Sequence, residues 1–382
     1  MRNQKEHTPD TPEKMSHQAE VFANRLTKQY RHLRKWARNN RISCYRLYDR
    51  DIPEVPLACD LYTFLPDDIG DKLSAILFLN EQNASISRND QSSSATLAGI
   101  QSRTYLHMYL YERPYDKPED EEKKWLDAMA EKASSVLGID RGHVIIKTRR
   151  RQSGTEESRT SQYEKIQSEK TVTGIVFEQG QIFHVNLSDY IDTGLFFDHR
   201  PLREMVRSSC AGKSVLNLFC YTSSFSVYAA EGRAKKIESV DLSRTYIEWG
   251  QKNMALNDFT DQERYTFTRD DVSAFLDKKI ASKTDFYDII ILDPPTFSNS
   301  KKTESTLDLN RDWITLVTKC LSLLTEKGVL YFSTNSRRLS FNGDLLPKTP
   351  DGNPYRFEDI TEKTIPEDYR NAKIHRVWKI ER

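Results

Sequence analysis

Apolar residues in the second half of the chain gather into short runs of strand length, and the segments between these runs have helical spacing. Helices are expected over residues 225–230, 243–256 and 313–324. Strands are expected over residues 215–219, 237–240, 265–268, 286–292 and 329–333, with a closing pair over 357–361 and 375–380. Alternation of buried strands with helices is typical of a doubly wound α/β fold. The pattern therefore predicts a mostly parallel, seven-stranded sheet.

The first half of the chain has a different pattern. Residues 18–39 place apolar side chains such as Phe22, Leu26 and Leu33 at helical spacing, with basic residues on the remaining face. Residues 63–104 include a stretch rich in Asn, Ser, Gln and Asp, which predicts a mobile insertion. The other expected elements are strands over residues 42–48, 105–111 and 144–147, a helix over 118–137, and a hairpin over 174–178 and 182–186. These elements indicate a small α+β domain.

The length of the chain, 382 residues, is enough for two domains with separate cores. We therefore expect a disordered tail at residues 1–17 and a basic helix with a small α+β domain over 18–189. A Rossmann-like α/β domain is expected over residues 190–382.

Five cysteines are scattered along the chain without Cys-x-x-Cys spacing. This usage indicates a reducing compartment and favours neither disulfides nor a metal site. Residues 1–14 lack an apolar leader segment, and no apolar stretch reaches membrane-spanning length. A cytoplasmic protein without a membrane partner is therefore expected.

The net charge of +1 conceals a strong local imbalance. Basic residues crowd positions 25–50 with hardly any acids, and a second basic cluster follows the strand expected at 144–147. Such density favours a polyanion such as RNA, which is bound with release of counterions. An ordinary solvated helix face is the alternative interpretation. The predicted RNA contacts are Arg31, Arg34, Lys35, Arg38, Lys147, Arg149, Arg150 and Arg151.

Polar residues stand at the expected carboxyl ends of four successive strands, and ligands of open α/β sheets bind at that edge. These residues are Asn217, Asp241, Asp271 and Asp293. Asp241 ends a strand–loop–helix–strand unit, about 20 residues beyond its loop, where an acid accepts hydrogen bonds from ribose hydroxyls. The loop lacks the glycines of a phosphate-binding signature, so S-adenosylmethionine (SAM) fits better than a nucleotide. A chance acid in an unrelated α/β unit is the alternative.

These positions predict roles in a SAM site. Asp271, backed by the amide of Val272, is expected to accept from the adenine amine. Two interpretations stay open for Asp198 and Arg200, which either close over the cofactor or form a salt-bridged corner between domains. The predicted cofactor residues are Phe196, Asp198, Arg200, Asn217, Tyr221, Thr222, Ser223, Ser224, Asp241, Leu242, Ser243, Asp271, Val272 and Asp293. The predicted catalytic residues form a rigid turn beside the transferred methyl group and are Asp293, Pro294, Pro295 and Phe297.

Longer motifs at residues 22–26, 190–200, 240–249 and 293–301 make the interpretation more specific. Together they resemble the RlmK-type family of 23S rRNA guanine-N7 methyltransferases, which forms the C-terminal half of the fused bacterial RlmKL proteins. The resemblance implies a class I SAM-dependent methyltransferase preceded by a small α+β RNA-binding domain. It also implies 23S rRNA as substrate, in an assembly intermediate of the large ribosomal subunit, and a separate RlmL-like protein partner. The chain departs from the family in the insertion at 63–104 and in Ser223, where a glycine is usual.

The residues near the expected methyl-transfer site favour some target atoms of a methyltransferase over others. Methylation of cytosine C5 requires a nucleophilic cysteine, and residues 296–300 and 332–336 contain none. Guanine N7 carries a free lone pair and needs only alignment, with Phe297 or Phe196 stacking on the base. Cytosine-5 methylation and a non-catalytic RNA-binding scaffold, the latter suggested by Ser223, remain the alternatives.

Overall fold

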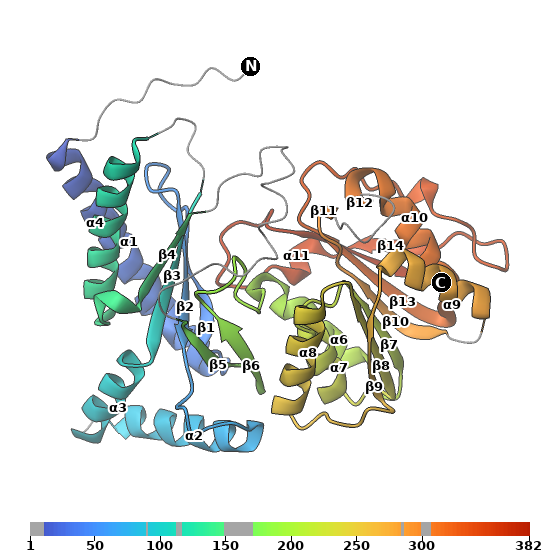
Figure 1. Cartoon of the computed structure of the whole chain (residues 1–382), viewed down its shortest axis with the longest axis horizontal. Helices are drawn as coiled ribbons and strands as arrows, with labels where there is room; N and C mark the ends of the chain where they lie inside the picture. Colours follow the sequence, from blue (N-terminus) through green and yellow to red (C-terminus); the bar gives the residue numbers. More distant parts are fainter. Residues whose placement is uncertain (1–10, 89–90, 112–116, 149–170, 284–285, 299–306) are drawn as a thin grey trace. The chain divides into compact units, whose positions relative to one another are not determined.

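The computed structural model describes residues 11–88, 91–111, 117–148, 171–283, 286–298 and 307–382 (Figure 1). The chain divides into two compact units. The N-terminal unit comprises Met1–Thr193 together with Asp368–Arg370, and the C-terminal unit comprises Gly194–Glu367 with Asn371–Arg382. The boundary expected from the sequence was residue 189, and no return of residues 368–370 was expected. None of the helices in the described ranges has the length and apolar character of a membrane span.

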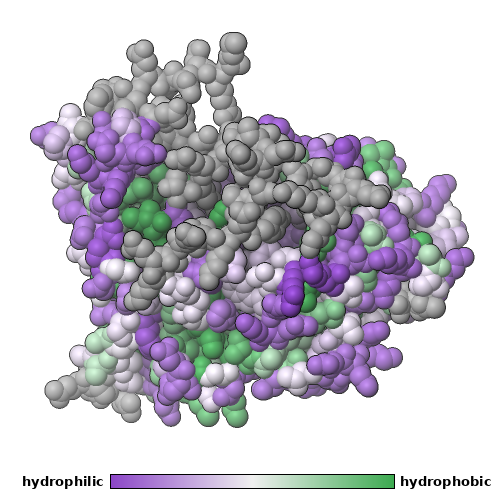
Figure 2. All heavy atoms as spheres, in the orientation of Figure 1, coloured by the Kyte–Doolittle hydropathy of each residue, from purple (hydrophilic) through white to green (hydrophobic). Residues whose placement is uncertain are grey.

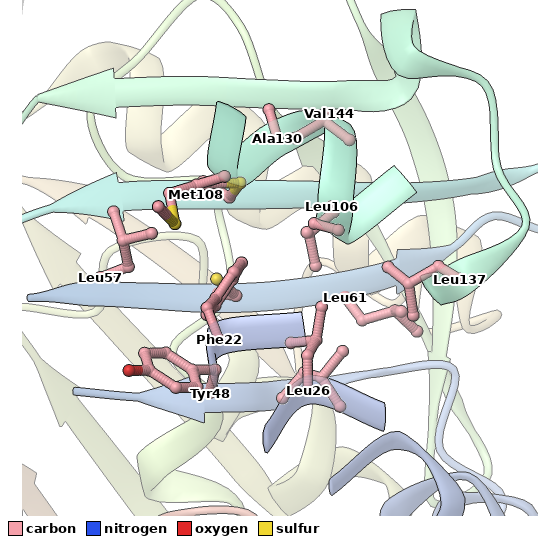
Figure 3. Close-up of a cluster of buried hydrophobic side chains, with 14 of the residues drawn as sticks. Phe22, Leu26, Tyr48, Leu57, Leu61, Leu106, Met108, Ala130, Leu137 and Val144 are labelled. Atoms are coloured by element: carbon pink, nitrogen blue, oxygen red, sulfur yellow. The ribbon is translucent and has the colours of Figure 1, made fainter. Parts of the chain in front are cut away.

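The N-terminal unit is built on a four-stranded sheet in the order β1–β2–β3–β4, with β3 and β4 parallel and the other pairs antiparallel. These strands are Cys44–Asp49, Leu57–Thr63, Thr104–Leu110 and Val144–Thr148. Helices α1 (Pro12–Asn39) and α4 (Glu119–Leu137) pack on this sheet. In Figure 3, Phe22 and Leu26 of α1 and Ala130 of α4 lie against Leu61 and Met108 of the strands. The expected hairpin is present as β5 (Thr173–Glu178) and β6 (Gln181–Asn186).

Helix α1 is the expected amphipathic basic helix. Its buried residues include Phe22, Leu26 and Leu33, as the spacing predicted. The helix begins at Pro12, within the stretch expected to be a tail, because the Thr11 side chain accepts a hydrogen bond from the Lys14 amide and caps it. Proline is tolerated in this first turn, where its missing N–H has no intrahelical partner.

The polar stretch at 63–104, where a mobile insertion was expected, contains helices α2 (Lys72–Arg88) and α3 (Gln91–Gln101). Asp71 caps the first turn of α2, since its carboxylate accepts a hydrogen bond from the Ser74 amide at 2.9 Å. The Ser85 and Thr96 hydroxyls join the two helices at 2.8 Å. Polar side chains thus mark caps and a helix–helix contact here, which composition alone did not reveal.

The C-terminal unit contains the predicted seven-stranded sheet, in the order β14–β15–β13–β10–β7–β8–β9. The last five strands in this order pair in parallel, while β15 pairs antiparallel with both of its neighbours, β13 and β14. The strands are β7 Ser214–Leu218, β8 Lys236–Asp241, β9 Tyr265–Arg269, β10 Tyr287–Leu292, β13 Leu324–Thr334, β14 Arg356–Asp359 and β15 Arg376–Glu381. A separate two-stranded ladder joins β11 (Phe297–Ser298) and β12 (Leu307–Asp308).

Helices cover both faces of this sheet. Leu216 and Leu218 of β7 point to the face on which α9 and α10 form a core cluster. Asn217 between them points to the opposite face, because side chains alternate along a strand, and there it meets Ser226 of α7. This arrangement confirms the doubly wound fold. The helices are α6 Arg200–Ser209, α7 Ser224–Glu231, α8 Arg244–Leu256, α9 Val272–Ser282, α10 Leu309–Ser322 and α11 Thr361–Thr364, with short 3-10 turns at Phe197–His199 and Gly343–Leu345. A further 3-10 turn, Arg141–His143, belongs to the N-terminal unit.

Candidate functional site

The parallel strands β7, β8 and β10 end at one edge of the sheet, and three acids lie beyond this edge. Asp241 is the last residue of β8, Asp293 follows β10, and Asp271 stands between β9 and α9. Helix α7 begins just after β7, so a helix N-terminus belongs to the same region. The edge therefore combines hydrogen-bond acceptors with backbone donors.

Asp241 joins the loop after β7 to the start of α8. Its carboxylate accepts hydrogen bonds from the Tyr221 amide at 3.0 Å and from the Ser243 amide at 2.8 Å. Burial raises the pKa of Asp241 to about 6, an effect that outweighs the stabilisation by backbone N–H donors. Within the part of the chain that the structure describes, backbone amides are the partners of this carboxylate, so it can still gain from further donors such as ligand hydroxyls.

The loop between β7 and α7 has a strained backbone. Phe219, Tyr221 and Ser223 have positive φ angles of 54°, 50° and 62°. Ser223, which stands where a glycine is usual, thus has a backbone conformation that favours glycine. The loop is held in place because the buried Asn253 donates a hydrogen bond to the Thr222 carbonyl at 2.9 Å, while the Thr222 hydroxyl donates to the Gly194 carbonyl at 2.6 Å.

Gly250 on α8 makes room for the serine in this loop. A Cβ atom at Gly250 would come within 2.4 Å of the Ser223 hydroxyl oxygen. Gly250→Ala is therefore expected to lower the free energy of unfolding by about 2 kcal/mol through overpacking. Ser223→Gly should restore most of this loss in the double variant.

Chemical denaturation of the two single variants and the double variant measures this coupling. Gly99→Ala is the matched control, because α3 leaves open space where its Cβ atom would lie. Equal losses in Gly250→Ala with and without Ser223→Gly would contradict the proposed clash.

Asp293 is held from two sides. The Ser333 hydroxyl donates to one of its carboxylate oxygens, and Nε2 of His199 lies 3.0 Å from the other. Burial lowers the pKa of His199, although Asp198 and Asp293 act in the opposite sense and His375 and Arg203 in the same one. A neutral His199 thus donates its Nε2 proton to Asp293 and fixes the orientation of this carboxylate.

His199 belongs to a larger polar network. Its ring lies 4.6 Å from the ring of His375, between centroids. Nδ1 of His375 lies 3.1 Å from the Asp198 carboxylate, and Nε2 lies 2.9 Å from the Thr364 hydroxyl. Candidate ligand atoms of Asp198, His199 and His375 lie within 4.8 Å of one another. Both nitrogens of His375 already serve these hydrogen bonds, so the geometry favours a hydrogen-bond network over a metal centre.

Several predicted cofactor residues are buried rather than open to a ligand. Asn217 donates to the Ser226 hydroxyl at 2.9 Å beneath α7. Arg200 is 2% exposed, with its guanidinium over the Phe197 ring, and Val272 is equally buried. One oxygen of Asp271 caps α9 by accepting from the Ala274 amide at 3.0 Å. Asn217, Arg200 and the Val272 side chain therefore support the edge of the sheet from behind, whereas Asp271 is only half-buried.

Other predicted residues are accessible. Phe196 is 40% exposed, and its ring centroid lies 5.2 Å from that of Tyr221. Phe297 is 48% exposed and follows the turn at Asp293. Ser224 is the first residue of α7. Leu242, Ser243 and Pro295 are partly buried. Pro294, by contrast, is buried. Two aromatic rings therefore remain available for stacking.

The predicted RNA contacts lie in the N-terminal unit. Arg31, Arg34, Lys35 and Arg38 are exposed on α1. Lys147 on β4 donates a hydrogen bond to the Tyr190 carbonyl. Arg149, Arg150 and Arg151 lie outside the described residues.

Sequence reasoning missed His199, His375 and Ser333 as partners of the acids. His199 lies within the motif at residues 190–200, next to the predicted cofactor residue Asp198. This position was the one feature of the sequence that could have pointed to it. Ser333 lies on β13, which pairs with β10, and His375 lies just before β15, which pairs with β13. The contact of Ser333 with Asp293, and of His375 with Asp198 and His199, follows from strand order and not from any local pattern.

Comparisons with known proteins identify the family of this chain. Residues 104–352, well over half of the chain, match the family described as S-adenosylmethionine-dependent methyltransferase. The chain belongs to this family. Its SAM dependence accords with the buried Asp241 carboxylate, whose only partners among the described residues are backbone amides.

This methyltransferase is similar to much longer curated relatives. It is 39% identical over 369 residues to "Ribosomal RNA large subunit methyltransferase K/L" of Pseudomonas fluorescens, covering 96% of this chain and 41% of the relative. The protein of the same name from Stutzerimonas stutzeri is 39% identical over 380 residues, with 99% and 44% covered. The chain thus spans about two fifths of the length of these relatives.

Solved structures support the fold of the methyltransferase. A SAM-dependent methyltransferase from Streptococcus mutans has a TM-score of 0.64 at 18% identity, with 99% of this chain and 83% of that chain covered. A methyltransferase crystallised with SAH has a TM-score of 0.63 at the same identity and coverage. At this identity the likeness concerns the fold alone.

Proposed function

We propose that this protein transfers a methyl group from SAM to N7 of a guanine in 23S rRNA of the large ribosomal subunit. The rRNA part of the proposal rests on the names of the relatives. The observation that supports N7 as the target atom is the environment of Asp293. Its carboxylate accepts hydrogen bonds from His199 and Ser333. Such a carboxylate is fixed in place and is a poor general base.

Guanine N7 attacks with its own lone pair and loses no proton, so alignment and charge are what the protein must provide. Bound SAM supplies an electrophilic methyl group on a sulfonium. Asp241, with Leu242 and Ser243, would hold the ribose hydroxyls, and Asp271 with Val272 the adenine. Phe297 or Phe196 would stack on a flipped guanine.

Asp293 has a role suited to this reaction. The base becomes positively charged as the methyl group arrives, and a fixed carboxylate nearby stabilises that charge. It can also accept a hydrogen bond from the guanine amino group. Pro294 and Pro295 rigidify the turn, because each fixes its own φ angle.

The cysteines do not favour cytosine-5 methylation. All five thiols are buried. Burial raises the pKa of Cys220 well above its ordinary value and also raises that of Cys320. A thiol that resists ionisation is a poor nucleophile.

Further parts of the proposal concern partners and place. The RNA contacts would be made by Arg31, Arg34, Lys35, Arg38, Lys147, Arg149, Arg150 and Arg151. The substrate would be an assembly intermediate of the large subunit, with a separate RlmL-like protein as partner. A cytoplasmic location would go with this substrate.

The decisive experiment maps methyl groups on 23S rRNA from a strain that lacks the gene. This RNA is incubated with the protein and methyl-labelled SAM. One guanine should gain an N7 methyl group, with a Cys220→Ala/Cys320→Ala variant equally active. Label on cytosine would establish the C5 alternative. Tight RNA binding without any label would favour the scaffold.

A further inference from the structure

The N-terminal unit contains a cavity of about 550 Å³ that the methyltransferase fold does not explain. Its lining comes from α1, from α2 and α3, and from the sheet. The volume lies within the range of roughly 300–1,000 Å³ typical of small-ligand sites. Helices α2 and α3, for which the sequence predicted no function, thus form one wall of this cavity.

The interior of the cavity is apolar and aromatic. Tyr45, Phe64 and Phe177 line it and are buried. The α2–α3 wall adds aliphatic side chains, namely Ile76, Leu79, Ile86, Leu97 and Ile100. Apolar character continues outside on α2, where Leu73 and Leu77 are exposed, and Figure 2 shows apolar residues at the lower edge, where Figure 1 places this helix.

The rim of the cavity is strongly basic. Arg31, Arg34, Lys35, Arg38 and Arg41 line it and are exposed. None of the five forms an ion pair with a carboxylate among the described residues, and the lining contains no acid. Unpaired cations at this density attract a polyanion and release its counterions on binding.

Arg103 and three amides complete the site. The Arg103 guanidinium donates to the Phe64 carbonyl, to Gln82 at 3.2 Å and to the Gly99 carbonyl at 3.1 Å. It therefore fixes the α2–α3 wall against the sheet. Gln82 lines the cavity together with Asn80 and Asn83, and side-chain amides both donate and accept hydrogen bonds, as the edge of a nucleobase requires.

We propose that this cavity receives an unpaired nucleobase of the substrate RNA, with the phosphates on either side bound by the basic face of α1. The inference rests on the proposed function for the presence of RNA. A base has flat apolar faces and a polar edge, which match the aromatic interior and the amides. Taking a paired base out of its helix costs a few kcal/mol, so the site favours single-stranded or bulged RNA. An acidic peptide would also satisfy the rim but would leave the amides without a matching edge.

The test measures binding of the full chain to a fluorescent single-stranded 12-nucleotide RNA, an abasic strand of the same length and a blunt duplex. Ile76→Trp fills the cavity, and Leu77→Trp is the matched control because Leu77 is exposed outside it. Ile76→Trp should weaken binding of the single strand about tenfold, the effect of losing one stacked base. Leu77→Trp should leave it unchanged, and both variants should keep the thermal unfolding midpoint of the wild type.

A second pair of variants tests the rim. Lys35→Glu/Arg38→Glu should lower the slope of log affinity against log salt by about 1.4, at roughly 0.7 per lost phosphate contact. Lys28→Glu, on the same helix but outside the lining, should change the slope less.

Equal binding of the abasic and normal strands, with Ile76→Trp equal to Leu77→Trp, would overturn the proposal. Displacement of the RNA by a poly-glutamate peptide that Ile76→Trp no longer binds would assign the cavity to a protein partner instead. These readouts need no methyl transfer. A protein that labels no guanine but still prefers the normal strand refutes the proposed reaction alone, and one that labels guanine without this preference refutes the cavity alone.

Discussion

Replacing Asp241 by asparagine is expected to weaken SAM binding by about 100-fold or more. Two charge-assisted hydrogen bonds to ribose hydroxyls would each lose roughly 1.5–3 kcal/mol. The asparagine keeps the size of the side chain and one acceptor for the loop amides, so the fold should survive. Isothermal titration with SAM measures the effect, and Asp258→Asn is the control, since Asp258 is exposed and has a positive φ angle of 65° that asparagine tolerates.

The pH dependence of SAM binding by the wild type should reveal the ionisation of Asp241. The pKa of Asp241 is about 6 in the folded protein, against 3.8 for an ordinary aspartate. Hydroxyl donors favour the ionised form, so SAM affinity should be constant above this pH and should fall up to about tenfold per pH unit below it. Asp241→Asn should lack this dependence.

Stability should respond in the opposite direction. Because the pKa of Asp241 is raised on folding, the folded state binds this proton more tightly than the unfolded state does. The resulting stabilisation is present below pH 3.8 and is lost as the pH rises through about 6. Relative to the wild type, Asp241→Asn should therefore gain stability between pH 5 and pH 7.5, as thermal denaturation can measure. A variant that binds SAM normally, or that loses stability over this range, would contradict the assigned role.

The second large effect is expected at Asp293. Asp293→Asn should lower kcat by about 100-fold, the usual order for removing one charged group that faces the transition state. SAM affinity should stay within about threefold of the wild type, because the change lies in the turn beside the reacting atoms and not in the ribose contacts. Single-turnover kinetics with saturating SAM separates the two quantities.

His199→Gln distinguishes orientation from direct participation. Glutamine retains an N–H that can reach Asp293, so kcat should fall by only about tenfold, the scale of one imperfect buried hydrogen bond. His199→Ala leaves Ser333 as the side-chain partner of Asp293 among the described residues and should be the more severe change. A His199→Gln variant as impaired as Asp293→Asn would show that the imidazole itself acts on the substrate.

The sequence predicted the elements that its own periodicity encodes. Strand β10 reads Tyr287–Leu292 with four consecutive apolar residues at its end, and the amphipathic α1 follows its apolar spacing. Asp241 could be placed because it directly ends a strand. The α2–α3 pair could not, because apolar residues of α2 such as Leu73 and Leu77 are exposed, so its apolar positions do not form one buried stripe.

Side-chain direction was harder to predict than position. Asn217 was expected to face a ligand, yet the alternation of β7 turns it beneath α7. The contact between His199 and Asp293 joins the 3-10 turn Phe197–His199 to the end of strand β10. Only the completed sheet order brings such groups together, so no local rule could have found them.

The return of Asp368–Arg370 to the N-terminal unit bears on how the protein is made. The Asp368 carboxylate accepts a hydrogen bond from the Arg46 amide at 2.9 Å, and the Arg46 guanidinium lies over the Tyr369 ring at 4.7 Å. Ribosomes release a chain from its N-terminus, and domains usually fold in that order. Here the first unit includes residues that follow nearly all of the second unit in the sequence. Its last step of folding therefore has to wait until most of the second unit has been translated.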